Sequence, residues 1–250
     1  MSNLSQSFMA SIARTLNSAQ VACVLWGHPL LNVHGVPSII GSIDFVIPDD
    51  RLQTGIKALA QIKRLTPCLR GNLCPSHPQE RYTPPPAFHM HVDASEVTIG
   101  LYLQSETLWF LPPLDDSLSS PQKLELPSYF VLASDQTVLP PWRPGRGSGV
   151  FKSGEYPVVV PRSFILLEAF LRLYARDSAK RIGSFGLPMI GYMEQYVDDD
   201  GFLDVTQLVE PLKTFYEELK EGKKPVRQWT TELKEALGIP EEEPEDYRTW

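Results

Sequence analysis

The segment from Val24 to Asp50 combines residue types that phosphate and metal chemistry uses. An apolar run ends at Gly27, and a second apolar run begins at Ser42 and carries Asp44 near its centre. Glycine lets a backbone turn approach a phosphate closely because it has no Cβ. Side chains two residues apart on a strand face the same side, so paired carboxylates at this spacing can share a divalent metal. The first of these two positions is Ser42, so only one carboxylate of such a pair is present.

A second candidate is the alternating segment AFHMHVD at residues 87–93. Its apolar side chains are expected on one face of a strand, and His89, His91 and Asp93 on the other. A pair of histidines on one face is a candidate general base. If that face is exposed to solvent, the two histidines are ordinary surface residues.

A third candidate is the segment SFILLEAFLRLYARDSAKR, in which Glu168, Arg172 and Arg176 recur every four residues. Residues at this spacing lie on one face of a helix. Glu168 either enters a cleft as an acid, a base or a guanidinium partner, or forms a surface pair with Arg172 worth a few tenths of a kcal/mol. In the first case the arginines, with Lys180 and Arg181, would meet phosphates.

The net charge of −7 hides an uneven distribution. Residues 142–181 carry eight basic and three acidic groups, whereas residues 182–250 carry seven basic and sixteen acidic groups. The basic segment opens with the glycine-rich run from Trp142 to Gly149, which contains Arg143 and Arg146, and continues to Lys152. Arginine beside glycine and tryptophan suits a nucleic-acid contact, through charge on phosphate and stacking of the ring. The run is equally consistent with a plain linker.

The acidic run that begins at Asp198 and ends at Gly201 also has two interpretations. It is typical of a helix end followed by a turn. It could also form an acidic pocket for a cationic substrate.

Several classes of protein are excluded or disfavoured. No run of about 18 apolar residues exists to span a membrane, and the polar N-terminal segment lacks the apolar core of a signal peptide. Three cysteines are an odd and sparse set, so a disulfide framework is not expected and a cytoplasmic location is. Cys68, Cys74 and His77 could in principle hold a metal. Their spacing is not a CxxC knuckle and no fourth ligand is evident, so no metal site is expected.

The elements that position these residues follow from periodicity. Strands are expected at residues 21–26, 42–47, 87–93, 97–103, 107–111, 129–132 and 158–160. Helices are expected at residues 3–18, 28–35, 49–64, 161–177, 187–197, 205–220 and 226–237. The fold class is therefore α+β, a mixed sheet flanked by helices with a helical C-terminal region. The expected parts are a core at 1–160, a helical region packed on it at 161–240 and a loose acidic tail at 241–250.

The run VLWGHPLLNVHGVPSIIGSIDFVIPDD resembles the nucleotidyltransferase superfamily of the DNA-polymerase-β type, and fungal nucleotidyltransferase-like proteins in particular. The resemblance implies a nucleotidyltransferase-like fold with a glycine turn, an Asp-x-Asp on the next strand and a third carboxylate on a later strand. Asp93 is the candidate for that third carboxylate. The chain departs from the pattern because His28 replaces a small turn residue and Ser42 replaces the first aspartate. Both departures weaken the expectation of metal-dependent nucleotidyl transfer.

The whole chain is also similar to the fungal arginine-containing cyclodipeptide synthases. The similarity lies in three parts: VLWG…GVP…DFVIPDD, then RYTPPPAFHMHV…LYLQSETLWFLPPL, and the segment LLEAFLRLYARDSAK. It implies that two aminoacyl groups, one arginyl, are taken from charged tRNA and condensed to a diketopiperazine, without a metal, ATP or another cofactor. Ser42 could then be acylated with His89 or His91 as base. Asp44 could orient that base or bind the arginyl guanidinium through both oxygens.

These interpretations give three groups of site residues. The expected catalytic residues are Ser42, Asp44, His89, His91, Asp93 and Glu168. The expected substrate-binding residues are Trp26, Gly27, His28, Arg172 and Asp198. The expected tRNA-binding residues are Arg143, Arg146, Lys152, Arg176, Lys180 and Arg181. Two alternatives stay open: a nucleotidyltransferase that uses Mg²⁺ and acts on a small molecule, and a non-catalytic binding protein in which Ser42 only fills the space of a lost aspartate.

Overall fold

A computed structural model describes residues 5–69, 74, 83–120 and 126–240. His77 and the tail expected at 241–250 lie outside these residues. The chain divides into two compact units, the first comprising Met1–His77 with Pro85–Arg162 and the second Pro78–Pro84 with Ser163–Trp250. Strands and helices share the first unit, whereas the described part of the second is helical. The fold is therefore α+β.

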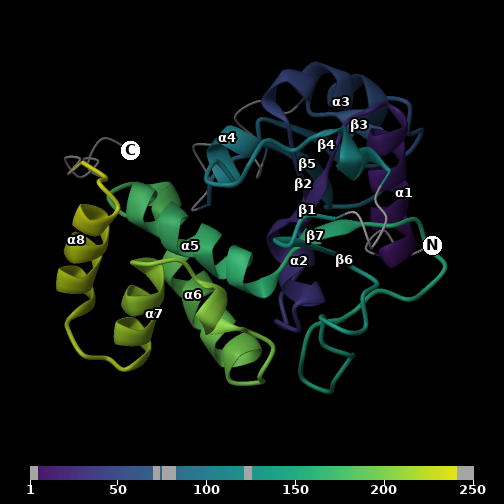
Figure 1. The fold of residues 1–250 in the computed structure, drawn as a ribbon. Coiled ribbons are helices and arrows are strands. Elements are labelled where there is room, and N and C mark those ends of the chain that lie inside the picture. The colour runs from purple at the N-terminus through teal and green to yellow at the C-terminus, as the bar shows by residue number, and fades with distance from the viewer. Residues whose placement is uncertain (1–4, 70–73, 75–82, 121–125, 241–250) are drawn as a thin grey trace. The chain divides into compact units, whose positions relative to one another are not determined.

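The first unit is built on one mixed sheet of seven strands in the order β3-β4-β5-β2-β1-β7-β6 (Figure 1). The strands are β1 (Val24–Trp26), β2 (Ser42–Ile47), β3 (Leu65–Pro67), β4 (Phe88–Val92), β5 (Thr98–Leu103), β6 (Phe130–Leu132) and β7 (Val159–Pro161). The pairs β2–β5 and β1–β7 are parallel, and the other neighbours are antiparallel. The central strands are rich in β-branched and aromatic residues and almost fully buried.

Two helices cover one face of this sheet. Helix α1 (Gln6–Ser18) begins where the Ser5 side chain accepts a hydrogen bond from the backbone N–H of Phe8. Helix α3 (Leu52–Leu59) follows a 3-10 turn at Asp49–Arg51. Gly55 of α3 lies against the side chains of Leu16 in α1, Ile47 in β2 and Leu101 in β5. The core of the unit is therefore formed where α1, α3 and the sheet meet.

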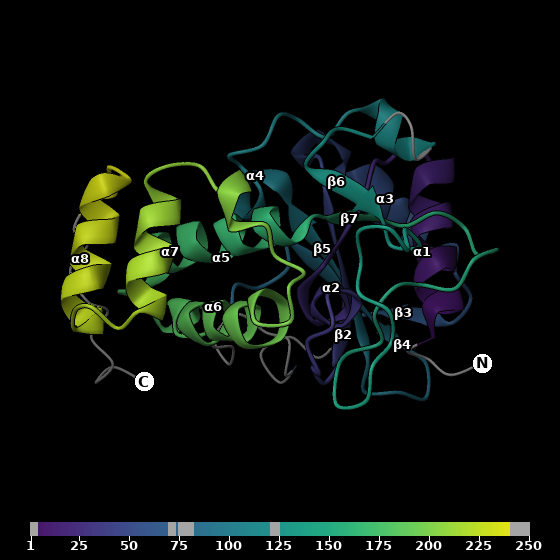
Figure 2. The ribbon, with the colours of Figure 1, turned by 60° about the horizontal axis from the view of Figure 1, so that its bottom comes forward.

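The second unit consists of helices α5 (Ser163–Asp177), α6 (Gly186–Met193), α7 (Leu212–Lys220) and α8 (Val226–Ala236). Figure 2 shows α7 and α8 side by side. Trp229 of α8 is fully buried, and its indole N–H donates to the carbonyl of Phe215 in α7 at 2.8 Å. The ring of Tyr174 in α5 lies against the same indole, tilted by 30° and with 6.0 Å between ring centroids. In the part of the chain that the structure describes, no helix is long and apolar enough to cross a membrane.

Two sequence-based expectations for the elements are wrong, and one strand was missed. Residues 107–111 are not a strand, because β5 is followed at once by the short helix α4 (Gln104–Thr107), and the Gln104 amide binds the loop at Pro112 and Leu114. The helix expected at 205–220 is interrupted, since a 3-10 turn at Val205–Gln207 is separated from α7 by Pro211. Strand β3 was not expected at all.

A buried histidine joins the end of helix α2 (Gly27–Val33) to the sheet. His34 is 2% exposed, and its Nε2–H donates to the carbonyl of Pro161 in β7 at 2.9 Å. Burial lowers the pKa of His34 from 6.5 to about 4, and this effect outweighs the hydrogen bond to Pro161.

The lowered pKa of His34 predicts a loss of stability in mild acid. As the pH decreases from 6.5 to about 4, the unfolded chain takes up a proton at this residue and the folded chain does not. The free energy of unfolding therefore decreases as the pH is lowered through this range, by up to about 3 kcal/mol. Urea unfolding from pH 7 to pH 4.5 measures this slope. In His34→Gln, which keeps the donor to Pro161, we expect a shallower slope. Equal slopes in the two proteins would contradict this account.

Candidate functional site

The strand register gathers several candidate residues on the sheet face opposite α1 and α3. One row crosses four strands and contains Trp26, Asp44, Gly100 and His89. The neighbouring row on the same face contains Ser42, Thr98, His91 and Thr66. Side chains directly opposite one another on paired strands point to the same face. The alternation expected around His89 and His91 is confirmed, because Met90 and Val92 are buried in the other direction.

The centre of this face is a buried carboxylate enclosed by two glycines. Asp44 is 4% exposed, and its Oδ2 accepts a hydrogen bond from the half-buried Ser42 Oγ at 2.6 Å. A Cβ on Gly27 would lie 2.8 Å from Oδ2, and a Cβ on Gly100 would lie 2.3 Å from Oδ1. Gly27 also has a φ of +68°, which favours glycine. Both glycines therefore leave space for the Asp44 carboxylate.

The two residues that flank Gly27 lie where β1 ends and α2 begins. Trp26 is the neighbour of Asp44 across the strands and is 6% exposed. The Nδ1 of His28 lies 2.5 Å from the Ser38 hydroxyl. The side-chain amide of Asn32 donates to the carbonyls of His28 and Ser38, at 3.1 and 2.8 Å. His28 is therefore held by the loop that leads into β2.

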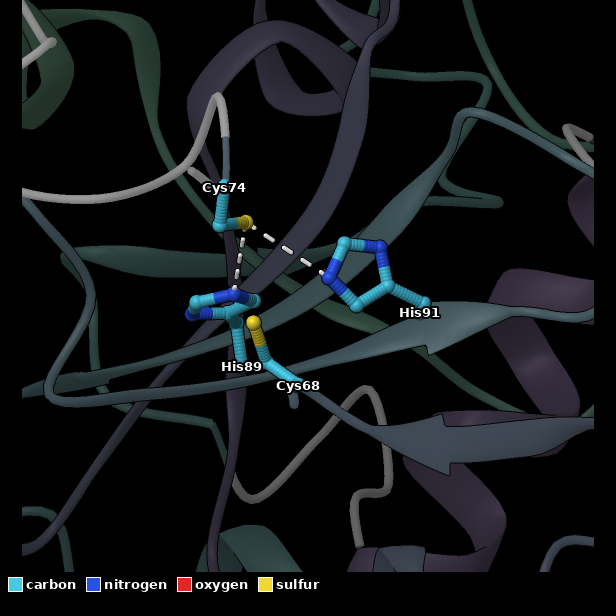
Figure 3. Close-up of side chains that lie close together, drawn as sticks. All are labelled: Cys68, Cys74, His89 and His91. Atoms are coloured by element: carbon cyan, nitrogen blue, oxygen red, sulfur yellow. Dashed lines mark hydrogen bonds between the residues drawn. The ribbon is translucent and has the colours of Figure 1, made fainter. Parts of the chain in front are cut away.

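His89 and His91 form a cluster with two cysteines (Figure 3). The Sγ of Cys74 lies 3.3 Å from His89 Nε2 and 3.5 Å from His91 Nε2. Cys68 completes the group, in which the four nitrogen and sulfur atoms all lie within 4.8 Å of one another. Both imidazoles thus turn toward Cys74. Ser42 is two strand spacings from His91, roughly 10 Å, so the structure does not bring either histidine to Ser42 as a base.

Sequence reasoning considered two of these cysteines together with His77 and did not connect them to His89 and His91. The expectation that the chain has no metal site considered only Cys68, Cys74 and His77, and His77 lies outside the described residues. The available signal was the His-x-His alternation on one strand face. It could be connected to Cys68 only through strand β3, because Cys68 directly follows Pro67, the last residue of β3, which pairs with Met90.

Asp93 does not lie beside Asp44. It is exposed in the turn that follows β4, where its backbone N–H donates to the carbonyl of Arg64. Asp44 is aligned with His89, and Asp93 is four residues further along, about 13 Å at the rise of a strand. This placement does not support Asp93 as a further metal carboxylate.

Glu168 and its neighbours lie in α5, in the second unit. Glu168 is buried, and its Oε1 accepts from Nε of Arg172 at 2.8 Å, so this pair is more enclosed than a surface pair. Arg176 binds the buried Asp177, with 2.6 Å between its terminal nitrogen and Oδ2. Lys180 lies 3.8 Å from the same carboxylate. Asp177 was not among the expected residues, although it organises two of the expected tRNA-binding cations.

Asp198 holds two parts of the second unit together. Its Oδ2 accepts hydrogen bonds from the Tyr216 hydroxyl at 2.8 Å and from Lys220 Nζ at 2.7 Å. Burial and the bond to Asp198 raise the pKa of the Tyr216 hydroxyl. The acidic run therefore already binds a cation of this chain, which favours the structural interpretation of Asp198 over a substrate pocket.

The glycine-rich basic loop is packed against the end of α2. The N–H of Gly147 donates to the carbonyl of Gly35 at 2.7 Å, and a Cβ on Gly147 would lie 2.5 Å from the carbonyl oxygen of Asn32. Gly147 therefore has a packing role. Trp142 is 68% exposed.

The expected tRNA-binding cations of the basic segment lie on different segments of the chain. Arg143 and Arg146 are half-buried in the glycine-rich loop, Lys152 is exposed beyond it, and Arg181 is half-buried in a 3-10 turn of the second unit. A role of these residues in binding tRNA stays a prediction.

The chain matches no protein-family model, no curated protein and no solved structure. Function is therefore inferred from the residues themselves, their geometry and the resemblances of the sequence.

The tight space around Asp44 predicts an energetic coupling between Asp44 and Gly100. Gly100→Ala should lower the free energy of unfolding by about 1–3 kcal/mol, because the new Cβ collides with Oδ1. In an Asp44→Ala background the same change should cost less, which urea unfolding of the four proteins measures as a double-mutant cycle. Gly41→Ala is the matched control, since no atom lies within 4 Å of a Cβ there. Additive effects at positions 44 and 100 would disprove the coupling.

Proposed function

We propose that this protein is a cytoplasmic aminoacyltransferase with a nucleotidyltransferase-like core that condenses two aminoacyl groups from tRNA, one of them arginyl, into a cyclic dipeptide. The observation that carries the proposal is the hydrogen bond from Ser42 Oγ to the buried carboxylate of Asp44 at 2.6 Å. The choice of arginyl comes from the resemblance to the arginine-containing cyclodipeptide synthases.

The Ser42–Asp44 pair suits acyl transfer from an activated ester. A distance of 2.6 Å is typical of a hydrogen bond from a hydroxyl to a carboxylate, which fixes the proton and leaves the lone pairs of Oγ free. Ser42 Oγ would attack the ester carbonyl of the first aminoacyl-tRNA, and its proton would pass through Asp44 to the departing ribose oxygen. Ser42 is half-buried and Asp44 is buried, which suits a nucleophile and its enclosed partner.

Two aminolysis steps complete the proposed reaction. The amino group of the second aminoacyl-tRNA attacks the ester on Ser42, which forms a peptide bond and returns the serine hydroxyl. The free amine of the resulting dipeptidyl-tRNA then attacks its own ester carbonyl, closes the diketopiperazine ring and releases the second tRNA. Each new bond replaces an ester bond, so neither ATP nor a redox partner is required.

The arrangement around Asp44 favours this chemistry over nucleotidyl transfer. A two-metal phosphoryl site needs several carboxylates around the ions. Position 42 carries a hydroxyl, and Asp93 lies about 13 Å along the strand from the row of Asp44. Among the described residues, no group of three acidic, histidine or cysteine ligands includes Asp44. These residues support an ester substrate that is already activated.

The basic segment supports tRNA as the carrier. Trp142 presents an exposed ring for stacking, and the exposed Lys152 offers charge for phosphate. Arg172 and Arg176 are engaged with Glu168 and Asp177, so they fit a supporting role in α5 better than a direct phosphate contact. A contact made by few cations is expected to weaken strongly with salt.

The proposal predicts loss of product when the Ser42–Asp44 pair is altered. Purified protein with arginyl-tRNA and a mixture of other aminoacyl-tRNAs should yield an arginine-containing diketopiperazine, detected by mass spectrometry. Asp44→Asn, which can still accept the bond from Ser42 but carries no charge, should reduce the yield at least about 100-fold. Asp50→Asn is the matched control, because that carboxylate is 79% exposed and pairs only weakly with Arg51.

Three outcomes would count against the proposal. A wild-type protein that is folded but yields no cyclic dipeptide from any aminoacyl-tRNA mixture would overturn the function. Full activity in Ser42→Ala would remove the acyl-serine intermediate. Product formed only with a nucleoside triphosphate and Mg²⁺ would favour the nucleotidyltransferase alternative.

A further inference from the structure

We propose that Cys68, Cys74, His89 and His91 bind one zinc ion as a closed tetrahedral site. Zinc lies about 2.3 Å from sulfur and 2.0–2.1 Å from nitrogen, which places neighbouring S and N ligands of a tetrahedron about 3.6 Å apart. The two Cys74–histidine distances are 3.3 and 3.5 Å. The Cys74 sulfur and the two imidazole nitrogens thus already lie near the separations that a zinc ion requires, and all four donor atoms lie within 4.8 Å of one another.

The sheet explains why these donors meet. His89 and His91 are two apart on β4 and therefore share a face. Cys68 directly follows β3, whose last residue, Pro67, pairs with Met90 next to His89. Cys74 is 1% exposed, and its sulfur is directed toward both imidazoles (Figure 3). Three ligands are thus positioned by two paired strands, and the fourth is supplied by the connection between those strands.

The donor set selects zinc among the common metals. Two cysteines and two histidines in tetrahedral order are typical of a structural zinc site, whereas magnesium and calcium prefer oxygen ligands. A nucleophilic Cys–His pair would need one histidine and an accessible sulfur. Here two imidazoles and a second cysteine converge on a sulfur that is almost completely buried.

The proposed ion would stabilise the sheet edge beside Asp44. With four protein ligands the site has no open position for substrate, so its role is structural. Both thiols lose their protons on binding, and the ion then links β3, β4 and Cys74. His89 of β4 lies in the same row as Gly100 of β5 and Asp44 of β2. The ion would therefore fix β4, which pairs with β5, and Gly100 of β5 leaves the space for the Asp44 carboxylate. This inference does not depend on the proposed enzymatic activity.

Metal analysis of the full chain tests the site. Protein purified under reducing conditions without chelator should contain about one zinc ion per chain. X-ray absorption at the zinc edge should show two sulfur ligands at about 2.3 Å and two nitrogen ligands at about 2.0 Å. Replacement by cobalt should give the intense visible bands of a tetrahedral ion and thiolate charge-transfer absorption. A folded wild-type protein that neither contains zinc nor takes it up, or a disulfide between Cys68 and Cys74 in the reduced preparation, would overturn the proposal.

Variants connect the metal to these four residues. Cys74→Ser and His91→Ala should each lose stoichiometric zinc, while Cys23→Ala, a buried cysteine outside the cluster, should retain it. Circular dichroism checks that each variant is folded. If the ligand variants do not fold, the absorption spectrum of the wild-type protein still decides the ligand set. Undiminished zinc in a folded Cys68→Ser/Cys74→Ser double variant would place the ion elsewhere and contradict the site.

Discussion

The register between the parallel strands β2 and β5 is the constraint on which the rest of the first unit depends. It places Asp44 opposite Gly100, where any Cβ would collide with the carboxylate. The turn after β4 fixes the antiparallel register of β4 with β5, which brings His89 into the same row. A shift of β2 by one residue would turn Asp44 to the opposite face of the sheet, away from Gly100 and His89. This register therefore determines the surroundings of Asp44, whereas the Cys–His cluster depends on β4 and its register with β3.

The two faces of the sheet solve different energetic problems. The face toward α1 and α3 buries apolar side chains, which contact one another without directional requirements. The opposite face buries polar groups, and such burial is costly unless each group finds a partner. Ser42 bonds to Asp44, and Cys74 lies against two imidazoles. Since polar partners need defined distances, this face specifies its geometry more narrowly than the apolar face.

Sequence reasoning predicted the local structure better than the site. Hydrophobic periodicity located β2, β4, α1 and α5, because each has a strong pattern within its own segment. It missed β3, a strand of three residues at Leu65–Pro67 whose pairing with β4 depends on residues more than twenty positions away. Without β3 the partnership of Cys68 with His89 could not be inferred.

Ion pairs, too, could be predicted from the sequence only in part. The spacing of Glu168 and Arg172 correctly indicated one helix face, but only the fold shows that Glu168 is buried. Arg176 was expected on the same helix face as Arg172, where both would meet phosphates, and it binds the adjacent Asp177. Burial and competition between partners are thus set by tertiary packing, which spacing alone does not encode.

The connection between β3 and β4 explains why a metal would be useful at this edge of the sheet. Strand β3 ends at Pro67 and β4 begins at Phe88, so twenty residues lie between these two paired strands. A long connection costs conformational entropy when its ends are brought together. Cys68 and Cys74 lie in its first part, and His89 and His91 lie just beyond its end, so one ion would cross-link it near both ends. Fixing β3 on β4 also fixes β4 on β5, and β5 carries the glycine that leaves Asp44 its space.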